Sequence, residues 1–219
     1  MINGELIDLV AGDYEARIAT SGATLVHLRR AGSDLVIPFD AEVSLPEGWQ
    51  GKTLVPWPNR IVGARYAYRG QEYPVPCNEP ETGSALHGLV GWADFQVVAT
   101  SAGDDAVGDS PSSVALELTL PGSYAYPWSL QVDVRFALDA RAGLTVAATT
   151  TCLGAGAPAA PDAVGAPESD GLLAPAPYGV SFHPYLTRSV PLDECVLQVP
   201  AARVLDVDER MAPPAERDV

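Results

Sequence analysis

Short segments of alternating apolar and polar residues, separated by turn residues, recur along most of this chain. Residues 14–20, for example, lie between Ala11-Gly12-Asp13 and Ser21-Gly22. No window of a dozen residues has the apolar spacing of a helix that faces a core. Strands and turns at this spacing are typical of a β-sandwich or barrel. We therefore expect an all-β, antiparallel fold, with residues 1–219 forming a single domain.

The expected strands share this alternation and have turn-forming residues at their ends. They are residues 6–10, 14–20, 23–30, 35–37, 65–68, 71–75, 95–99, 114–120, 130–138, 144–152 and 196–199, with one more around His183. Residues 154–177 are rich in Ala, Pro and Gly, which predicts an irregular loop. The chain from residue 206 onward is also expected to be loop.

Two of the expected strands make specific predictions about which side chains are buried. In residues 130–138 the alternation places Val132, Val134 and Phe136 on one buried face. In residues 23–30 it places Val26 and Leu28 on one face and His27 on the other. His27 has no glycine or proline neighbour, so we interpret it as an outward-facing histidine without a functional role.

Composition excludes several classes of protein. The net charge of −15, with Lys52 as the only lysine, disfavours binding to nucleic acid, because such a field repels phosphate. The three cysteines are far apart, which disfavours a disulfide scaffold or a thiolate zinc site and favours a reducing compartment. We see no signal peptide and no membrane-spanning apolar run, so we expect a cytoplasmic protein without a membrane partner.

Residues 177–186, Pro-Tyr-Gly-Val-Ser-Phe-His-Pro-Tyr-Leu, place His183 in an apolar, aromatic stretch. Imidazole is the usual proton donor or acceptor at neutral pH. Pro184 removes a ladder donor, so the strand ends there or lies at an edge, where His183 could face a cleft. The alternative is a half-buried histidine packed against Tyr178 and Tyr185. The partial Gly-x-Ser motif at Ser181 lacks its last glycine, which makes a hydrolase nucleophile a weak hypothesis.

Two more stretches carry candidate binding groups. Pro56 and Pro58 stiffen a loop that presents Asn59 and Arg60, and His87 lies in a glycine-flanked loop. Singly, they could be a surface arginine and a turn histidine. With His183 they suggest two proton-transfer groups beside a fork of donors, suited to an uncharged ligand with many hydroxyls. No phosphate loop, dinucleotide fingerprint or metal-binding histidine pair occurs, so we expect no cofactor and no metal.

Three motifs in order resemble the aldose 1-epimerase (galactose mutarotase) family: Pro58-Asn59-Arg60, residues 86–92 (Leu-His-Gly-Leu-Val-Gly-Trp), and residues 177–186. The resemblance implies an antiparallel β-supersandwich and interconversion of the α and β anomers of a free aldose such as glucose or galactose. It implies His183 as general acid and His87 as the second histidine. It also implies Asn59 and Arg60 as sugar-hydroxyl ligands and Tyr185 as an aromatic wall.

The resemblance also marks one departure and leaves alternatives open. The family's glutamate base and its substrate-binding aspartate lie near the C-terminus, and neither Glu209 nor Glu216 matches the glutamate motif. We therefore expect a chain truncated at its C-terminus, with an incomplete sandwich and doubtful activity. The alternatives are a hexose-6-phosphate mutarotase using Arg65, Arg69 and Arg188, a non-catalytic carbohydrate-binding protein, and a purely structural sandwich. The oligomeric state is not predicted.

Overall fold

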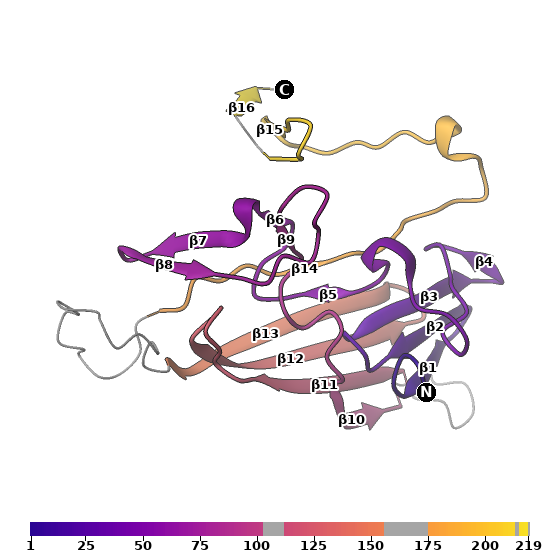
Figure 1. The fold of residues 1–219 in the computed structure, drawn as a ribbon. Helices are drawn as coiled ribbons and strands as arrows, with labels where there is room; N and C mark the ends of the chain where they lie inside the picture. Colours follow the sequence, from indigo (N-terminus) through magenta and orange to yellow (C-terminus); the bar gives the residue numbers. More distant parts are fainter. Residues whose placement is uncertain (103–111, 156–174, 213–214, 219) are drawn as a thin grey trace.

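Two four-stranded antiparallel sheets form the body of the protein (Figure 1). The computed structural model describes residues 1–102, 112–155, 175–212 and 215–218. The strands of the first sheet, in order, are β1 (Leu6–Ala11), β2 (Tyr14–Ala19), β3 (Thr24–Arg30) and β4 (Ser33–Asp34). Those of the second are β10 (Gln96–Ser101), β11 (Ser113–Leu120), β12 (Trp128–Asp139) and β13 (Gly143–Ala155). The predicted all-β, antiparallel fold class is confirmed.

The main core lies between these sheets, where β12 packs against β1 and β2. Alternate residues of β12 are buried, and they include the predicted Val132, Val134 and Phe136. Leu9 and Ile18 meet them from the first sheet and are fully buried. Burial of each such large apolar side chain contributes roughly 1.5–3 kcal/mol. The strict alternation of the sequence is thus what holds the sheets together.

A β-bulge at Val26 overturns one prediction about strand β3. Arg17 pairs with His27 while Ile18 pairs with Leu25, so Val26 is an extra residue in the ladder. Leu25 and Leu28 therefore face the main core, whereas Val26 packs in a separate cluster with Ala19 and Ala41. The prediction that Val26 and Leu28 share one face is wrong, because an inserted residue shifts the side-chain alternation. Nothing in the local pattern of residues 23–30 signals this insertion.

Three pairs of short strands lie outside the two large sheets, and the first two of them join segments that are far apart in sequence. They are β5 (Thr53–Leu54) with β14 (Ser181–Phe182), β6 (Arg60–Ile61) with β9 (Ala85–Leu86), and the hairpin β7 (Arg65–Tyr68) with β8 (Gln71–Pro74). Single turns of 3₁₀-helix occur at Glu47–Trp49, Val62–Ala64 and Leu192–Glu194. The predicted 65–75 hairpin is confirmed, and Arg69 and Gly70 supply its left-handed turn. The first two pairs bring the three sequence motifs together.

The C-terminal part of the chain differs from what the sequence predicts. Residues 196–199 form no strand, and the side chains of Val196 and Leu197 are 93% and 84% exposed. An apolar, β-branched run forms a strand only where another backbone pairs with it. Residues after 206 are not all loop either, because β15 (Arg203–Asp206) pairs with β16 (Ala215–Asp218). This hairpin lies above β6 and β9 in Figure 1.

Two further predictions meet the limits of the described chain. Most of the 154–177 segment, residues 156–174, lies outside the described residues, while residues 154–155 complete β13. The single-domain assignment stays a prediction.

Within the described residues no helix is long and apolar enough to cross a membrane. Cys77, Cys152 and Cys195 are free thiols, and the described part of the chain contains no metal-binding cluster of His, Cys, Asp or Glu.

Candidate functional site

His87 and His183 lie side by side, although 96 positions separate them in the sequence. Their ring centroids are 5.0 Å apart and the rings are nearly perpendicular, at 80°. His87 follows β9, which pairs with β6, and His183 follows β14, which pairs with β5. The backbone of His183 is fixed on both sides, because its N–H donates to the Lys52 carbonyl and its own carbonyl accepts from Gly51. The approach of the two imidazoles is therefore built by two strand pairings.

The ring of His87 is held in one orientation by Asn59. The Asn59 backbone N–H donates to Nδ1 of His87 at 3.0 Å, and the His87 backbone N–H donates to the Asn59 carbonyl at 2.9 Å. Because Nδ1 accepts a hydrogen bond, the neutral ring carries its proton on Nε2. Burial, with the nearby His183 and Arg60, lowers the pKa of His87 to about 4. At neutral pH, His87 is thus an uncharged ring with one N–H to donate.

Arg60 lies in the same network but is tied to a carboxylate. Its Nε and Nη2 donate to the two carboxylate oxygens of Glu79, both at 2.6 Å, and Nη1 donates to Oδ1 of Asn59 at 3.2 Å. Both side chains of the ion pair are only 18% exposed. The pairing raises the pKa of Arg60 and lowers that of Glu79. The pair is therefore fully ionised at neutral pH, with its charges cancelled locally.

Tyr185 also contacts the ring of His183. The two ring centroids are 5.5 Å apart, tilted at 43°. The Tyr185 hydroxyl donates to the Gly48 carbonyl at 2.9 Å, so the ring is anchored to the 3₁₀ turn at Glu47–Trp49. All five residues predicted for the site, Asn59, Arg60, His87, His183 and Tyr185, are thus linked by hydrogen bonds or ring contacts.

Two tryptophans that the sequence did not predict for the site also contact these rings. Trp49 contacts His87 edge-on at 5.3 Å between centroids, and Trp92 lies 5.4 Å from Trp49. Trp49 packs closely against Gly91, where a Cβ would lie 2.6 Å from the indole. Trp92 is 48% exposed, which is unusual for a side chain this large and apolar. A partly exposed aromatic ring such as that of Trp92 is suited to pack against the apolar C–H surface of a sugar ring.

Lys52 is buried next to Trp92. It is completely buried, its ammonium donates to the Ser21 carbonyl at 3.1 Å, and its Nζ lies 4.2 Å from the Trp92 ring centroid. Burial lowers its pKa to about 8. The sequence shows that Lys52 is the only lysine but does not indicate its burial. The sequence analysis missed four residues of this region: Glu79, Trp49, Trp92 and Lys52. Three of them, Glu79, Trp49 and Lys52, belong to no motif. Trp92 follows a glycine, which does not by itself indicate a site.

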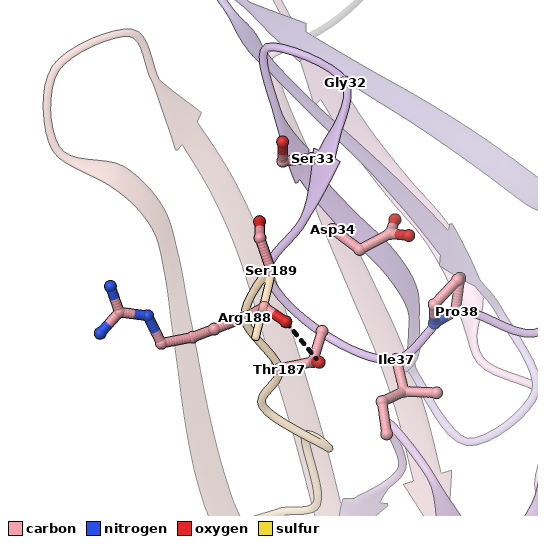
Figure 2. Close-up of a pocket in the computed structure, with 8 residues that line it drawn as sticks. All are labelled: Gly32, Ser33, Asp34, Ile37, Pro38, Thr187, Arg188 and Ser189. Atoms are coloured by element: carbon pink, nitrogen blue, oxygen red, sulfur yellow. Dashed lines mark hydrogen bonds between the residues drawn. The ribbon is translucent and has the colours of Figure 1, made fainter. Parts of the chain in front are cut away.

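A separate hollow of about 480 Å³ lies elsewhere on the surface (Figure 2). Residues 32–34, 37–38 and 187–189 line it, and the Arg188 side chain points away from the others. None of the five predicted site residues contributes to its lining. A second hollow beside β1, β2 and β3 includes His27, whose ring lies close to Arg17 and Arg29. Neither His87 nor His183 lines this second hollow.

Two solved structures share the fold of this chain. A GalM/aldose epimerase homologue from C. elegans superposes with a TM-score of 0.72 at 22% identity, over 98% of this chain and 61% of its own. Galactose 1-epimerase from Lactobacillus acidophilus NCFM also gives 0.72, at 16% identity, over 94% of this chain and 56% of its own. At such low identities these similarities establish the fold alone, which is galactose mutarotase-like.

The chain belongs to the aldose 1-epimerase family, whose sequence profile, described as Aldose 1-epimerase, matches residues 5–159. This match includes Asn59, Arg60 and His87, and it ends before His183 and Tyr185. A curated relative, the Uncharacterized protein YihR of Escherichia coli (strain K12), is 40% identical over 212 residues. Those residues are 96% of this chain and 60% of the relative. The chain thus spans about three-fifths of the length of the relatives described here.

Proposed function

We propose that this protein binds a free aldose and interconverts its α and β anomers. The observation that carries the proposal is the 5.0 Å approach of His87 and His183. The two rings have different capacities, because Nδ1 of His87 is occupied and its pKa is about 4. A half-buried ring with a perturbed pKa beside a second imidazole is typical of acid–base sites. Family membership supports the same reaction.

The proposed chemistry is opening and reclosing of a cyclic hemiacetal. A proton is delivered to the ring oxygen, the bond from that oxygen to C1 breaks, and the anomeric hydroxyl loses its proton to solvent water, which leaves an aldehyde. Rotation about C1–C2 and the reverse transfers then close the ring on the other face. A positioned acid contributes roughly 10²–10⁴-fold to such a transfer. The reaction needs no cofactor.

Each predicted residue takes one role in this proposal. Since His87 stays neutral at pH 7, His183 is assigned as the general acid at the ring oxygen. The Nε2–H of His87 donates to an oxygen of the sugar, and Asn59 and Arg60 bind hydroxyls. Tyr185 packs against the pyranose. We assign no residue of this chain as the general base.

The surroundings of the arginines favour a free sugar over a hexose 6-phosphate. Arg65 pairs with Glu72 at 3.3 Å, and Arg69 lies over the Tyr68 ring at 5.6 Å. Arg188 lines the hollow of Figure 2. None of these three arginines belongs to the network around the two histidines. A phosphate-binding site would instead gather cationic donors beside the sugar.

Optical rotation tests the proposal directly. Freshly dissolved α-D-glucose or α-D-galactose relaxes to its anomeric equilibrium spontaneously, and we expect the full 219-residue chain to accelerate this relaxation in proportion to its concentration. Glucose 6-phosphate is run in parallel to separate the two substrate classes. Relaxation at the spontaneous rate at every protein concentration contradicts the proposed enzyme. Calorimetric binding of the same sugars without acceleration would favour a non-catalytic sugar-binding protein.

A further inference from the structure

One edge of the Arg60 guanidinium is completely occupied by Glu79. Nε and Nη2 are the two nitrogens on that edge, and each donates to a different carboxylate oxygen at 2.6 Å. Such a bidentate pair fixes the plane of the guanidinium as well as its position. The direction of the remaining Arg60 donors is therefore set by Glu79.

Glu79 is itself held rigidly. The Thr82 hydroxyl donates to the same Glu79 oxygen that Nε of Arg60 binds. The backbones of Glu79 and Ser84 exchange two hydrogen bonds of 3.2 Å, which closes the loop. Arg210, from the chain just after β15, donates to the Thr82 carbonyl at 2.9 Å. The carboxylate is thus a fixed support for the guanidinium.

The other end of the guanidinium connects to the histidine pair. Nη1 of Arg60 donates to Oδ1 of Asn59, whose backbone N–H holds Nδ1 of His87. A guanidinium has five N–H donors, and Glu79 and Asn59 take three of them. Two donors, one on Nη1 and one on Nη2, are left for a ligand beside His87. Their spacing suits two hydroxyl oxygens of one sugar.

We propose that Glu79 is a positioning residue of the sugar site: it aims the two remaining Arg60 donors at substrate hydroxyls and cancels the charge of the guanidinium. The inference rests on the proposed function, because Arg60 is a sugar ligand only if a sugar binds beside His87. Glu79 itself does not touch the sugar.

The charge cancellation has a measurable consequence. A guanidinium paired with a carboxylate attracts anions only weakly, whereas an unpaired, mostly buried one binds sulfate or phosphate readily. Removing the charge of Glu79 therefore creates an anion site that competes with the sugar. A residue that only stabilised the loop would not have this effect.

The experiment compares Glu79→Gln and Glu79→Asp with the wild-type chain in anomerisation assays. Because Arg60 holds the sugar before and during the reaction, Glu79→Gln is expected to raise KM about 10-fold while changing kcat less than about 3-fold. Inorganic sulfate, at constant ionic strength, should inhibit this variant competitively and about 10-fold more strongly than the wild type. Glu79→Asp keeps the charge but shortens the support, so its KM rises without the gain in sulfate inhibition.

A matched control is Glu72→Gln, which breaks the exposed Arg65–Glu72 pair on the β7–β8 hairpin and should change neither KM nor sulfate inhibition. Unchanged KM and sulfate inhibition in Glu79→Gln, with an active wild type, overturn this inference alone. If Glu79→Gln lowers both kcat and thermal stability but gains no sulfate inhibition, the inference is also overturned, since this result indicates a structural role only. If the wild type neither turns over nor binds sugar, the proposed function fails and this inference fails with it.

Discussion

Two hydrogen bonds join Asn59 and His87, one made by the His87 ring and the other by its backbone. The Asn59 backbone N–H donates to Nδ1 of His87 at 3.0 Å, and the His87 backbone N–H donates to the Asn59 carbonyl at 2.9 Å. Both residues have left-handed backbones, with φ of 58° and 63°. Non-glycine residues adopt this conformation rarely, and such strain is concentrated at functional sites. The pair fixes which nitrogen of His87 remains free to face a ligand.

His183→Gln is expected to lower kcat for anomerisation by roughly 10²–10⁴-fold, the contribution of one general acid. Glutamine keeps the polar volume but cannot deliver a proton near neutral pH. The measurement is the rate of optical-rotation change at saturating sugar. His27→Gln is the matched control, because His27 belongs to β3 and lines a different hollow that contains none of the five site residues. Equal rates for the two variants would exclude His183 as the acid.

His87 makes the fold less stable in acid. Its pKa is about 4 in the folded protein and near 6.5 when unfolded. Between these values the unfolded chain binds a proton that the folded chain does not, so the free energy of unfolding falls as the pH drops from 6.5 to 4. Replacing His87 by Gln removes this contribution. Urea unfolding at pH 7 and pH 4.5 should therefore show a smaller loss for His87→Gln than for the wild type, and equal losses would contradict the prediction.

Lys52 should make the free energy of unfolding depend on pH at the alkaline end of the range. Its pKa is about 8 in the folded protein and about 10.5 when unfolded. Between these values the unfolded chain binds the extra proton, so the wild type gains stability as the pH rises from 8 to 10.5. The full gain is about 3 kcal/mol. Lys52→Met fills the same space without a titrating group.

The quantity to measure for Lys52 is the difference in unfolding free energy between wild type and Lys52→Met. We expect this difference to shift in favour of the wild type across pH 8 to 10.5. A difference that is constant over this range would show that the ammonium is not buried as the structure describes.

Gly88 carries a backbone constraint next to His87 that Gly70 does not. Both have left-handed φ, +75° and +80°, but a Cβ on Gly88 would lie 2.2 Å from the Val55 carbonyl oxygen and one on Gly70 would meet open space. Gly70→Ala should therefore cost only the left-handed penalty, about 1–2 kcal/mol. Gly88→Ala should cost about 1–3 kcal/mol more, because backbone must move. Denaturant midpoints at equal slope measure both, and equal costs would contradict the close approach.

Sequence patterns predicted the elements whose cause is local. Alternation gave the buried face of β12, and the Arg69-Gly70 turn gave the β7–β8 hairpin, since both depend on neighbouring residues only. They failed at Val26, where one inserted residue reversed the alternation. They failed again at residues 196–199, whose strand-like composition found no partner backbone. Pairing between distant segments is not encoded in any short window.

The sequence by itself determined the all-β class, the rigid loop that carries Asn59 and Arg60, and the three motifs that indicated the family. Only the tertiary structure decided that His87 and His183 lie 5.0 Å apart, that Glu79 occupies one edge of Arg60, and that Lys52 is buried under Trp92. The physical reason is that strand propensity and turn chemistry act over a few residues, whereas each of these contacts joins side chains from different strands or loops. Their positions depend on which strands pair, and pairing is settled by the free energy of the whole fold.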